Sequence, residues 1–296
     1  MITGIILGLG AAFFQSFSYL MSRHFIQRHG SPIHLLIASH IIMGIMALLL
    51  LPFAYRELIL SPAHYISPLI QCAGFFLLGQ VAFFMALKKI ESSRLSPLLG
   101  IKIIIIAIIS WSFYHNSFTA IQWVAVAICF IGAMMTNWSG GTIPISAIIW
   151  IVTACTFYSL SDINIKALVD LFGQKELFNS ALLAASLNYI ICGIVALIFF
   201  FIIPNPQRWK HFKPALPFAC FWFAGMLCLF GCFGSIGPVF GNIIQSSRGI
   251  ISVIIGFAVA KAGHHHLEST TAGHLVIKRI IAAILMLLAV AMFAWK

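Results

Sequence analysis

The sequence predicts an all-α integral membrane protein with ten transmembrane helices, arranged as two inverted five-helix repeats. Three observations predict this fold class. Of 296 residues, 61% are hydrophobic and only 8% are charged, whereas a soluble domain carries about 25% charged residues. The apolar residues fall into ten runs, each long enough to cross a bilayer. The first five runs resemble the last five in order, which indicates a duplicated unit.

A hydrocarbon core of about 30 Å is crossed by about 20 residues of α-helix. Apolar runs of about that length, bounded by charged residues, glycine or proline, therefore mark the spans. The ranges are 2–21, 33–53, 67–87, 95–113, 121–138, 145–168, 178–203, 214–233, 239–260 and 275–295. The loops between them are short, so no soluble domain lies between the spans.

The first five spans have clear boundaries, because a charged side chain inside a bilayer is costly. Arg23 follows the first span, Arg56 follows the second, and Lys88 follows the third. The fourth span begins after Arg94, and the fifth ends before the glycine pair at 140 and 141. Each boundary predicts where the chain leaves the membrane.

The last five spans are bounded in the same way. Pro144 precedes the sixth span, Asp170 follows it, and the seventh lies between Glu176 and Pro204. Residues 231–241 contain four glycines and a proline in close succession. Because these residues break helices, the boundary between the eighth and ninth spans is the least sharp.

Matching residues recur in the two halves in the same order. Four sets of matches occur, at offsets of 143, 149, 146 and 157 residues in the first, second, fourth and fifth spans. Examples are Ser18 with Ser161, Gly44 with Gly193, Lys102 with Arg248, and Met135 with Met292. We therefore expect one repeat in residues 1–140 and a second in residues 141–296. A five-helix unit begins and ends on opposite sides of the membrane, so the second copy is inverted, as in many secondary transporters.

Basic residues are distributed unequally between the two predicted membrane faces. With Lys102 and Arg248 set aside, the face with both termini has four Lys or Arg, and the other has eleven. The eleven are Arg23, Arg28, Lys88, Lys89, Arg94, Arg208, Lys210, Lys213, Lys261, Lys278 and Arg279. Basic loops stay in the cytoplasm, so we expect both termini outside it, in a bacterial inner membrane. The net charge of +11 therefore reflects orientation and not a nucleic-acid partner.

Lys102 and Arg248 lie well inside predicted spans, about seven and nine residues from the start of each. At 1.5 Å per residue both are near the midplane, where a cation costs about 2.5–3.5 kcal/mol unless it faces water or a partner. Because the two are equivalent in the repeats, we expect them to approach each other and hold a carboxylate or phosphate. The alternative is a structural ion pair, or a side chain that extends to the membrane surface.

Asp162 is the one acidic residue of six that lies well inside a span. A single carboxylate cannot neutralise two cations. It is expected to pair with one of them, to bind an amine of the substrate, or to titrate and couple transport to protons. Tyr158 precedes it by four residues and shares its helix face.

Other polar side chains inside the spans suggest a polar lining. They are Gln15, Tyr19, His40, Gln80, Asn164, Asn188, Tyr189, Asn242 and Gln245. We assign Gln15, Tyr19, Gln245, His40 and Asn188, with Tyr158 and Asp162, to the lining of a substrate site. Hydrogen bonding between helices is the alternative for each of them, and His40 is also a candidate proton shuttle.

No metal or cofactor site is expected. The run at 264–266 has three consecutive histidines, but consecutive side chains seldom point at one ion, so a solvated loop is favoured. The seven cysteines are an odd number and all lie in apolar runs, which is typical of core residues.

Three short motifs accompany the ten spans and their duplication: FFMALKKI at 83–90, QWV at 122–124 before Gly132, and SDINIK at 161–166. With these features the chain resembles the EamA-like carriers of the drug/metabolite transporter superfamily. The resemblance covers essentially the whole chain and implies a transporter rather than an enzyme. In the phosphate-handling branch of that superfamily, basic residues of the fourth and ninth spans contact the anion, which implies this role for Lys102 and Arg248.

We therefore expect a secondary transporter that moves a small anionic or zwitterionic metabolite, such as an amino acid or its derivative, by alternating access. A membrane enzyme would normally show clustered carboxylates or histidines, and one intramembrane acid argues against that class. The remaining alternatives are a lipid-linked flippase or another membrane protein of the same fold that moves no metabolite.

Overall fold

A computed structural model describes residues 1–29, 31–54, 62–87, 99–113, 115–137, 144–173, 176–204, 208–248, 251, 254–255 and 273–295. Some residues used in the sequence analysis lie outside these ranges. They are Arg56, Lys88, Lys89, Arg94, Lys175, Lys261, Lys296 and the histidines at 264–266.

Each of the ten predicted spans contains part of a described α-helix. In the first half these are α1 (Ile2–His29), α2 (Pro32–Ala54), α3 (Pro62–Leu87), α5 (Ile101–Ser112) and α6 (Ala120–Asn137). In the second half they are α7 (Ile145–Leu171), α8 (Leu177–Ile202), α9 (Phe212–Ile236), α10 (Pro238–Gln245) and α12 (Gly273–Ala294), with a short 3₁₀ helix, η3 (Arg208–His211), before α9. Six of the described helices are long and apolar enough to cross a membrane.

Helix α1 continues two turns beyond the predicted end of the first span. Arg23 ends the apolar run, but Phe25 in the next turn is buried at 2% exposure, against Leu35, Ala38 and Phe218. The last turn carries Arg28 and His29, which is favourable at the negative end of the helix dipole. Hydropathy therefore located the apolar run but not the end of the helix.

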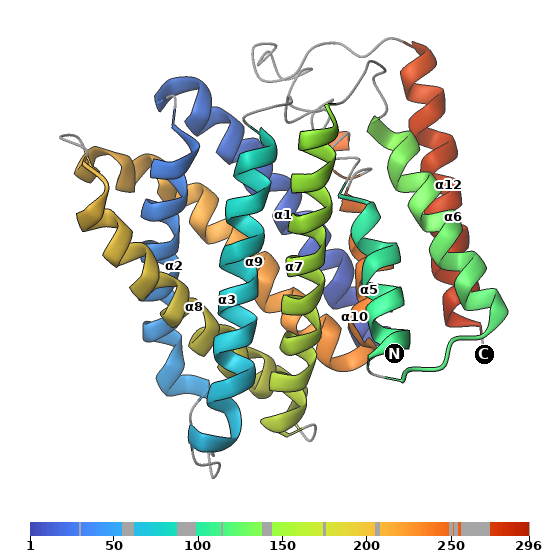
Figure 1. Ribbon diagram of the computed structural model, residues 1–296, viewed down its shortest axis with the longest axis horizontal. Coiled ribbons are helices and arrows are strands. Elements are labelled where there is room, and N and C mark those ends of the chain that lie inside the picture. Colours follow the sequence, from blue (N-terminus) through green and yellow to red (C-terminus); the bar gives the residue numbers. More distant parts are fainter. Residues whose placement is uncertain are drawn as a thin grey trace.

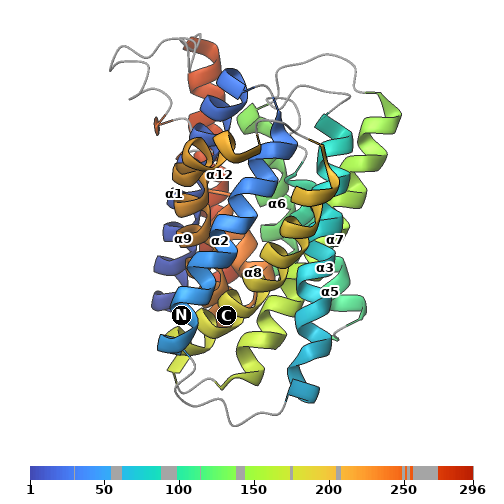
Figure 2. The ribbon, with the colours of Figure 1, turned by 90° about the vertical axis from the view of Figure 1, so that its left-hand side faces the viewer.

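The helices pack in pairs taken from the two halves of the chain. Helix α1 packs along α9, α3 along α7, α2 along α8, and α6 along α12. Figure 1 shows α2 and α8 at one edge of the bundle and α6 and α12 at the other. From the side, the α2–α8 pair lies between the α1–α9 pair and the α3–α7 pair (Figure 2). Both chain termini lie at the same end of the bundle (Figure 1).

Helices α2 and α8 cross with their backbones in contact. A Cβ atom built on Gly193 would lie 2.9 Å from the Cα of Gly44, and a Cβ on Gly44 would lie 3.0 Å from the Cα of Gly193. Only glycine permits this approach. The crossing borders the largest apolar core, which contains Met43, Tyr189 and Phe223.

The chain turns sharply between α9 and α10 at Gly237, as the glycine-rich stretch predicted. Its φ of 80° lies in the region that favours glycine. Pro238 then starts α10, where its missing N–H leaves no hydrogen bond unmade.

Candidate functional site

Lys102 lies at the start of the described helix α5, and Arg248 lies just after the end of α10. Lys102 is the second residue of α5, directly after a turn at residues 99 and 100. Helix α10 ends at Gln245, a turn occupies residues 246 and 247, and Arg248 follows it. The Ser246 hydroxyl donates to the Ile243 carbonyl at 2.5 Å, and such bonds compete with the helix ladder.

Lys102 forms an ion pair with the single intramembrane acid. Its Nζ lies 2.6 Å from Oδ2 of Asp162, and the Asn242 amide donates to the same oxygen at 2.7 Å. The Lys102 Nζ also lies 5.9 Å from the ring centroid of Tyr158. Of the three roles left open for Asp162, this geometry matches the first, pairing with a cation.

Arg248 is held by neutral groups. Its Nη1 donates to Oε1 of Gln15 at 3.1 Å, and the Gln245 amide donates to the same oxygen at 2.8 Å. The guanidinium lies 5.0 Å from the ring centroid of Tyr19, and Ser16 donates to the Arg248 carbonyl at 3.2 Å. Among the described residues, no carboxylate lies within ion-pair distance of Arg248.

The two cations use corresponding positions of α7 and α1. At the offset of 143 residues, Gln15 corresponds to Tyr158 and Tyr19 corresponds to Asp162. Each cation therefore contacts the same two positions, four residues apart on one helix face. The side chains differ at both positions, but the charge differs only at one, because the position that holds Asp162 in α7 holds the neutral phenol of Tyr19 in α1.

A series of aromatic rings links the two cation sites. Tyr158 lies 6.2 Å from Phe76, and Phe76 lies 6.3 Å from Tyr189, between ring centroids. The Trp222 indole donates to the Tyr189 hydroxyl at 2.9 Å, and its ring lies 5.9 Å from Tyr19. We call these five residues the aromatic series. They come from α1, α3, α7, α8 and α9, so the site lies where both halves of the chain meet.

Sequence reasoning missed some members of this arrangement. Phe76 and Trp222 were not singled out, because an aromatic residue in an apolar run gives no signal that separates a site from a core. Tyr189 and Asn242 were noted as intramembrane polar residues but were not assigned to the site. Their polar groups inside a span were the available signal.

His40 and Asn188 lie apart from the two cations, at the α2–α8 side. The His40 ring is 5.8 Å from Phe76, and its Nδ1 pairs with the Leu36 carbonyl at 2.9 Å. Its Nε2 and the Oδ1 of Asn188 are buried without a hydrogen-bond partner. The structure thus groups Lys102, Arg248, Asp162, Tyr158, Gln15, Tyr19 and Gln245 in two linked clusters, with His40 and Asn188 outside them.

The described residues contain no group of three metal-ligating side chains placed to hold an ion. The clusters instead combine fixed positive charge, amide and phenol donors, and aromatic faces. Such groups bind an organic anion through charge-assisted hydrogen bonds and contact its apolar part through the rings.

Comparison with known proteins finds one matching family. Residues 2–138 match the model of the EamA-like transporter family. The match covers the first of the two halves of the chain and supports membership of the drug/metabolite transporter superfamily. The family and the six long apolar helices support a multi-pass membrane protein, and the family suggests transport of a small molecule. The members are transporters and not enzymes.

The whole chain is also similar in fold to a solved structure described only as "Crystal structure of protein". The TM-score is 0.68 and the sequence identity 12%, over 99% of this chain and 97% of the other. At this identity the likeness shows a shared fold and no more. No curated protein matches the sequence.

Proposed function

We propose that this EamA-like transporter carries a small anionic or zwitterionic metabolite, such as an amino acid or its derivative, by alternating access. The substrate binds between the two halves of the chain, where Arg248 and Lys102 receive its acidic group. One observation carries the proposal: the start of α5 and the segment after α10 present two cations where both halves of the chain meet, and one acid, Asp162, pairs with Lys102 there. A substrate site between inverted repeats is typical of secondary transporters.

The helix pairing supports two inverted repeats, in residues 1–140 and 141–296. If the first span corresponds to the sixth and the third to the eighth, exchanging the halves turns the α1–α9 pair into the α7–α3 pair. The same exchange leaves the α2–α8 and α6–α12 pairs unchanged. Gly44 and Gly193, which correspond at an offset of 149 residues, contact each other as residues on a two-fold axis would.

The charge balance of the site favours one negative charge on the substrate. Asp162 neutralises Lys102 through an ion pair at 2.6 Å. Arg248 is held by the Gln15 amide and the Tyr19 ring, both neutral. A guanidinium presents two parallel N–H donors to a carboxylate or phosphate, so we assign the acidic group of the substrate to Arg248.

The aromatic series favours a substrate with an apolar part beside its charged group. Its rings come from five helices and lie between the two cations. An amine on the substrate would compete with Lys102 for Asp162, and protonation of Asp162 would release Lys102. Either event couples substrate or proton binding to the contact between α5 and α7.

The flux of labelled solutes into proteoliposomes tests the proposal. The panel contains aromatic and aliphatic amino acids, organic acids, phosphorylated sugars and nucleotides. For the solute that is carried, Arg248→Gln should lower uptake about a hundredfold, because it removes two charge-assisted hydrogen bonds. Arg248→Lys keeps the charge but not the paired donors, so it should recover only part of the flux.

Lys166→Gln is the matched control. Lys166 lies on α7 and pairs with Asp170 one turn later, near the end of the helix, so its loss should leave uptake unchanged. If wild type, Arg248→Gln and Lys102→Gln insert normally into the membrane and show equal uptake, neither cation binds the substrate and the proposed site is wrong. Movement of a lipid-linked substrate, with no flux of any solute in the panel, would favour a flippase instead.

A further inference from the structure

His40 lies beside the middle of the aromatic series, where α2 crosses α8. It precedes Gly44 by one helical turn, and its carbonyl oxygen would lie 3.2 Å from a Cβ atom built on Gly193. The imidazole ring lies 5.8 Å from the Phe76 ring and 6.4 Å from the Tyr189 ring, between centroids. Both rings belong to the aromatic series, so His40 adjoins the region that separates the two cations.

The His40 ring has one nitrogen with a partner and one without. Its Nδ1 lies 2.9 Å from the Leu36 carbonyl oxygen. Because a carbonyl oxygen only accepts, Nδ1 carries a hydrogen and donates. The Nε2 atom, at the far end of the ring from Cβ, is buried without a hydrogen-bond partner, and the residue as a whole is 4% exposed. A buried polar atom without a partner is costly, so a ligand group that completes it is favoured.

The unpaired Nε2 is an acceptor. A charged imidazole buried among aromatic rings is costly unless an acid lies beside it. Among the described residues, no carboxylate lies within ion-pair distance of His40. The ring is therefore neutral, and because Nδ1 holds its one hydrogen, Nε2 presents a lone pair. Its missing partner is a group that brings an N–H or O–H.

The equivalent residue of the second half finds its partner inside the protein. His40 corresponds to Tyr189 at the offset of 149 residues that also relates Gly44 to Gly193. The Tyr189 hydroxyl accepts a hydrogen bond from the Trp222 indole at 2.9 Å. No described side chain does the same for the Nε2 of His40. Two equivalent positions thus differ in this one contact, which leaves the acceptor of His40 for a molecule from outside the chain.

His40 is separated from Arg248 by aromatic rings. Successive contacts lead from the imidazole to the guanidinium through Tyr189, Trp222 and Tyr19. A substrate that places its acidic group at Arg248 and a donor at His40 therefore carries the two groups apart from each other. Its apolar part lies along the rings between them.

We propose that His40 selects the substrate by accepting a hydrogen bond from it at Nε2. The inference rests on the proposed function, in which Arg248 receives the acidic group. It adds the chemical class of the substrate, which is an organic anion or zwitterion with an apolar body and a hydroxyl or N–H donor remote from the acid. A molecule of the same shape without the donor leaves Nε2 unpaired and is carried less well.

Uptake of paired solutes into proteoliposomes tests the inference. The pairs are tyrosine with phenylalanine, and 4-hydroxyphenylpyruvate with phenylpyruvate, and the members of each pair differ in one hydroxyl. Wild type should take up the hydroxylated member about tenfold faster, the effect of one buried hydrogen bond. His40→Phe keeps a ring without an acceptor, so the ratio should fall to about one. His40→Gln places an amide oxygen near the position of Nε2 and should keep part of the preference.

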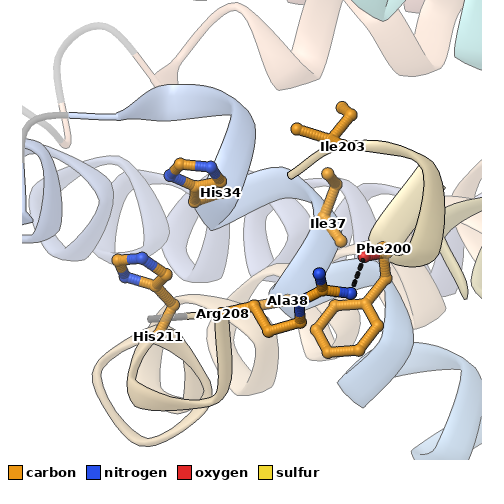
Figure 3. A pocket seen from close by; sticks show the side chains of 7 residues that line it. All are labelled: His34, Ile37, Ala38, Phe200, Ile203, Arg208 and His211. Atoms are coloured by element: carbon orange, nitrogen blue, oxygen red, sulfur yellow. Dashed lines mark hydrogen bonds between the residues drawn. The ribbon is translucent and has the colours of Figure 1, made fainter. Parts of the chain in front are cut away.

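His34→Phe is the control, because it makes the same exchange on α2 but away from the aromatic series. The His34 ring stacks on His211 with centroids 4.9 Å apart, in a pocket that Arg208 and Phe200 also line (Figure 3). None of these residues belongs to the two cation clusters. The preference of His34→Phe for the hydroxylated solute should equal that of wild type.

A wild-type ratio near one would overturn the inference without any variant, as would the absence of uptake of both pairs. An unchanged ratio in His40→Phe would also overturn it, even if total uptake falls, because a purely structural role lowers the uptake of both members equally. Failure of the proposed function gives a different result. Arg248→Gln would then leave the uptake of both members unchanged, although both carry the acidic group.

Discussion

Replacing Asp162 by Asn tests the energetics of the central ion pair most directly. The amide keeps the size of the side chain and an oxygen that can accept from Asn242. What is lost is the negative charge 2.6 Å from the Lys102 Nζ. The variant leaves a cation without its partner inside the bundle.

The expected cost is about 3 kcal/mol in the free energy of unfolding, at the lower end of about 3–5 kcal/mol for breaking a buried pair. The Lys102 and Asp162 side chains are 16% and 7% exposed, so water screens the pair little. Lys102→Met together with Asp162→Asn removes both charges. Because the desolvation penalty then disappears as well, the double variant should unfold within about 1 kcal/mol of wild type.

Steric trapping in bicelles measures the unfolding free energies of wild type, the two single variants and the double variant. Asp170→Asn breaks the exposed pair with Lys166 and serves as the control, with an expected loss below about 1 kcal/mol. The reasoning fails if Asp162→Asn costs no more than this control. It also fails if the double variant is no more stable than Asp162→Asn alone.

Two further predictions concern other parts of the fold. Gly193→Ala should destabilise the folded protein by about 1–3 kcal/mol, because its Cβ would lie 2.9 Å from the Gly44 Cα. Gly74→Ala is the control, because a Cβ at Gly74 would meet no atom within 4 Å. Thermal unfolding of the two variants and wild type measures the difference. A phosphatase fused to the carboxyl terminus should be active outside the cytoplasm, and activity of a cytoplasmic reporter there would reverse the orientation.

Much of the fold follows from hydropathy. The fifth predicted span, 121–138, matches α6 (Ala120–Asn137), and the seventh, 178–203, matches α8 (Leu177–Ile202). These runs are long, apolar and bounded by polar residues, so burial in lipid alone determines them. Prediction failed where helices continue past the apolar run, as α1 does, because a helix end depends on packing and capping as well as on hydropathy.

The turn at residues 246 and 247 was not predicted, although Ser246, Ser247 and Gly249 beside Arg248 were an available signal. Whether the backbone turns there depends on local hydrogen bonds, such as that from Ser246 to Ile243, and on contacts from α1, such as that from Ser16 to Arg248. These partners are distant in the sequence or compete with the helix ladder.

The sequence by itself determined that the chain lies in a membrane, where most of its spans run, and which two cations and one acid lie well inside them. These properties follow from the cost of placing charge and backbone polar groups in hydrocarbon, which each segment meets alone. Only the tertiary structure decided that Asp162 forms an ion pair with Lys102, while Arg248 contacts Gln15 and Tyr19. Pairing depends on which helices pack side by side, and apolar surfaces in lipid do not specify their neighbours until close contacts and hydrogen bonds select them.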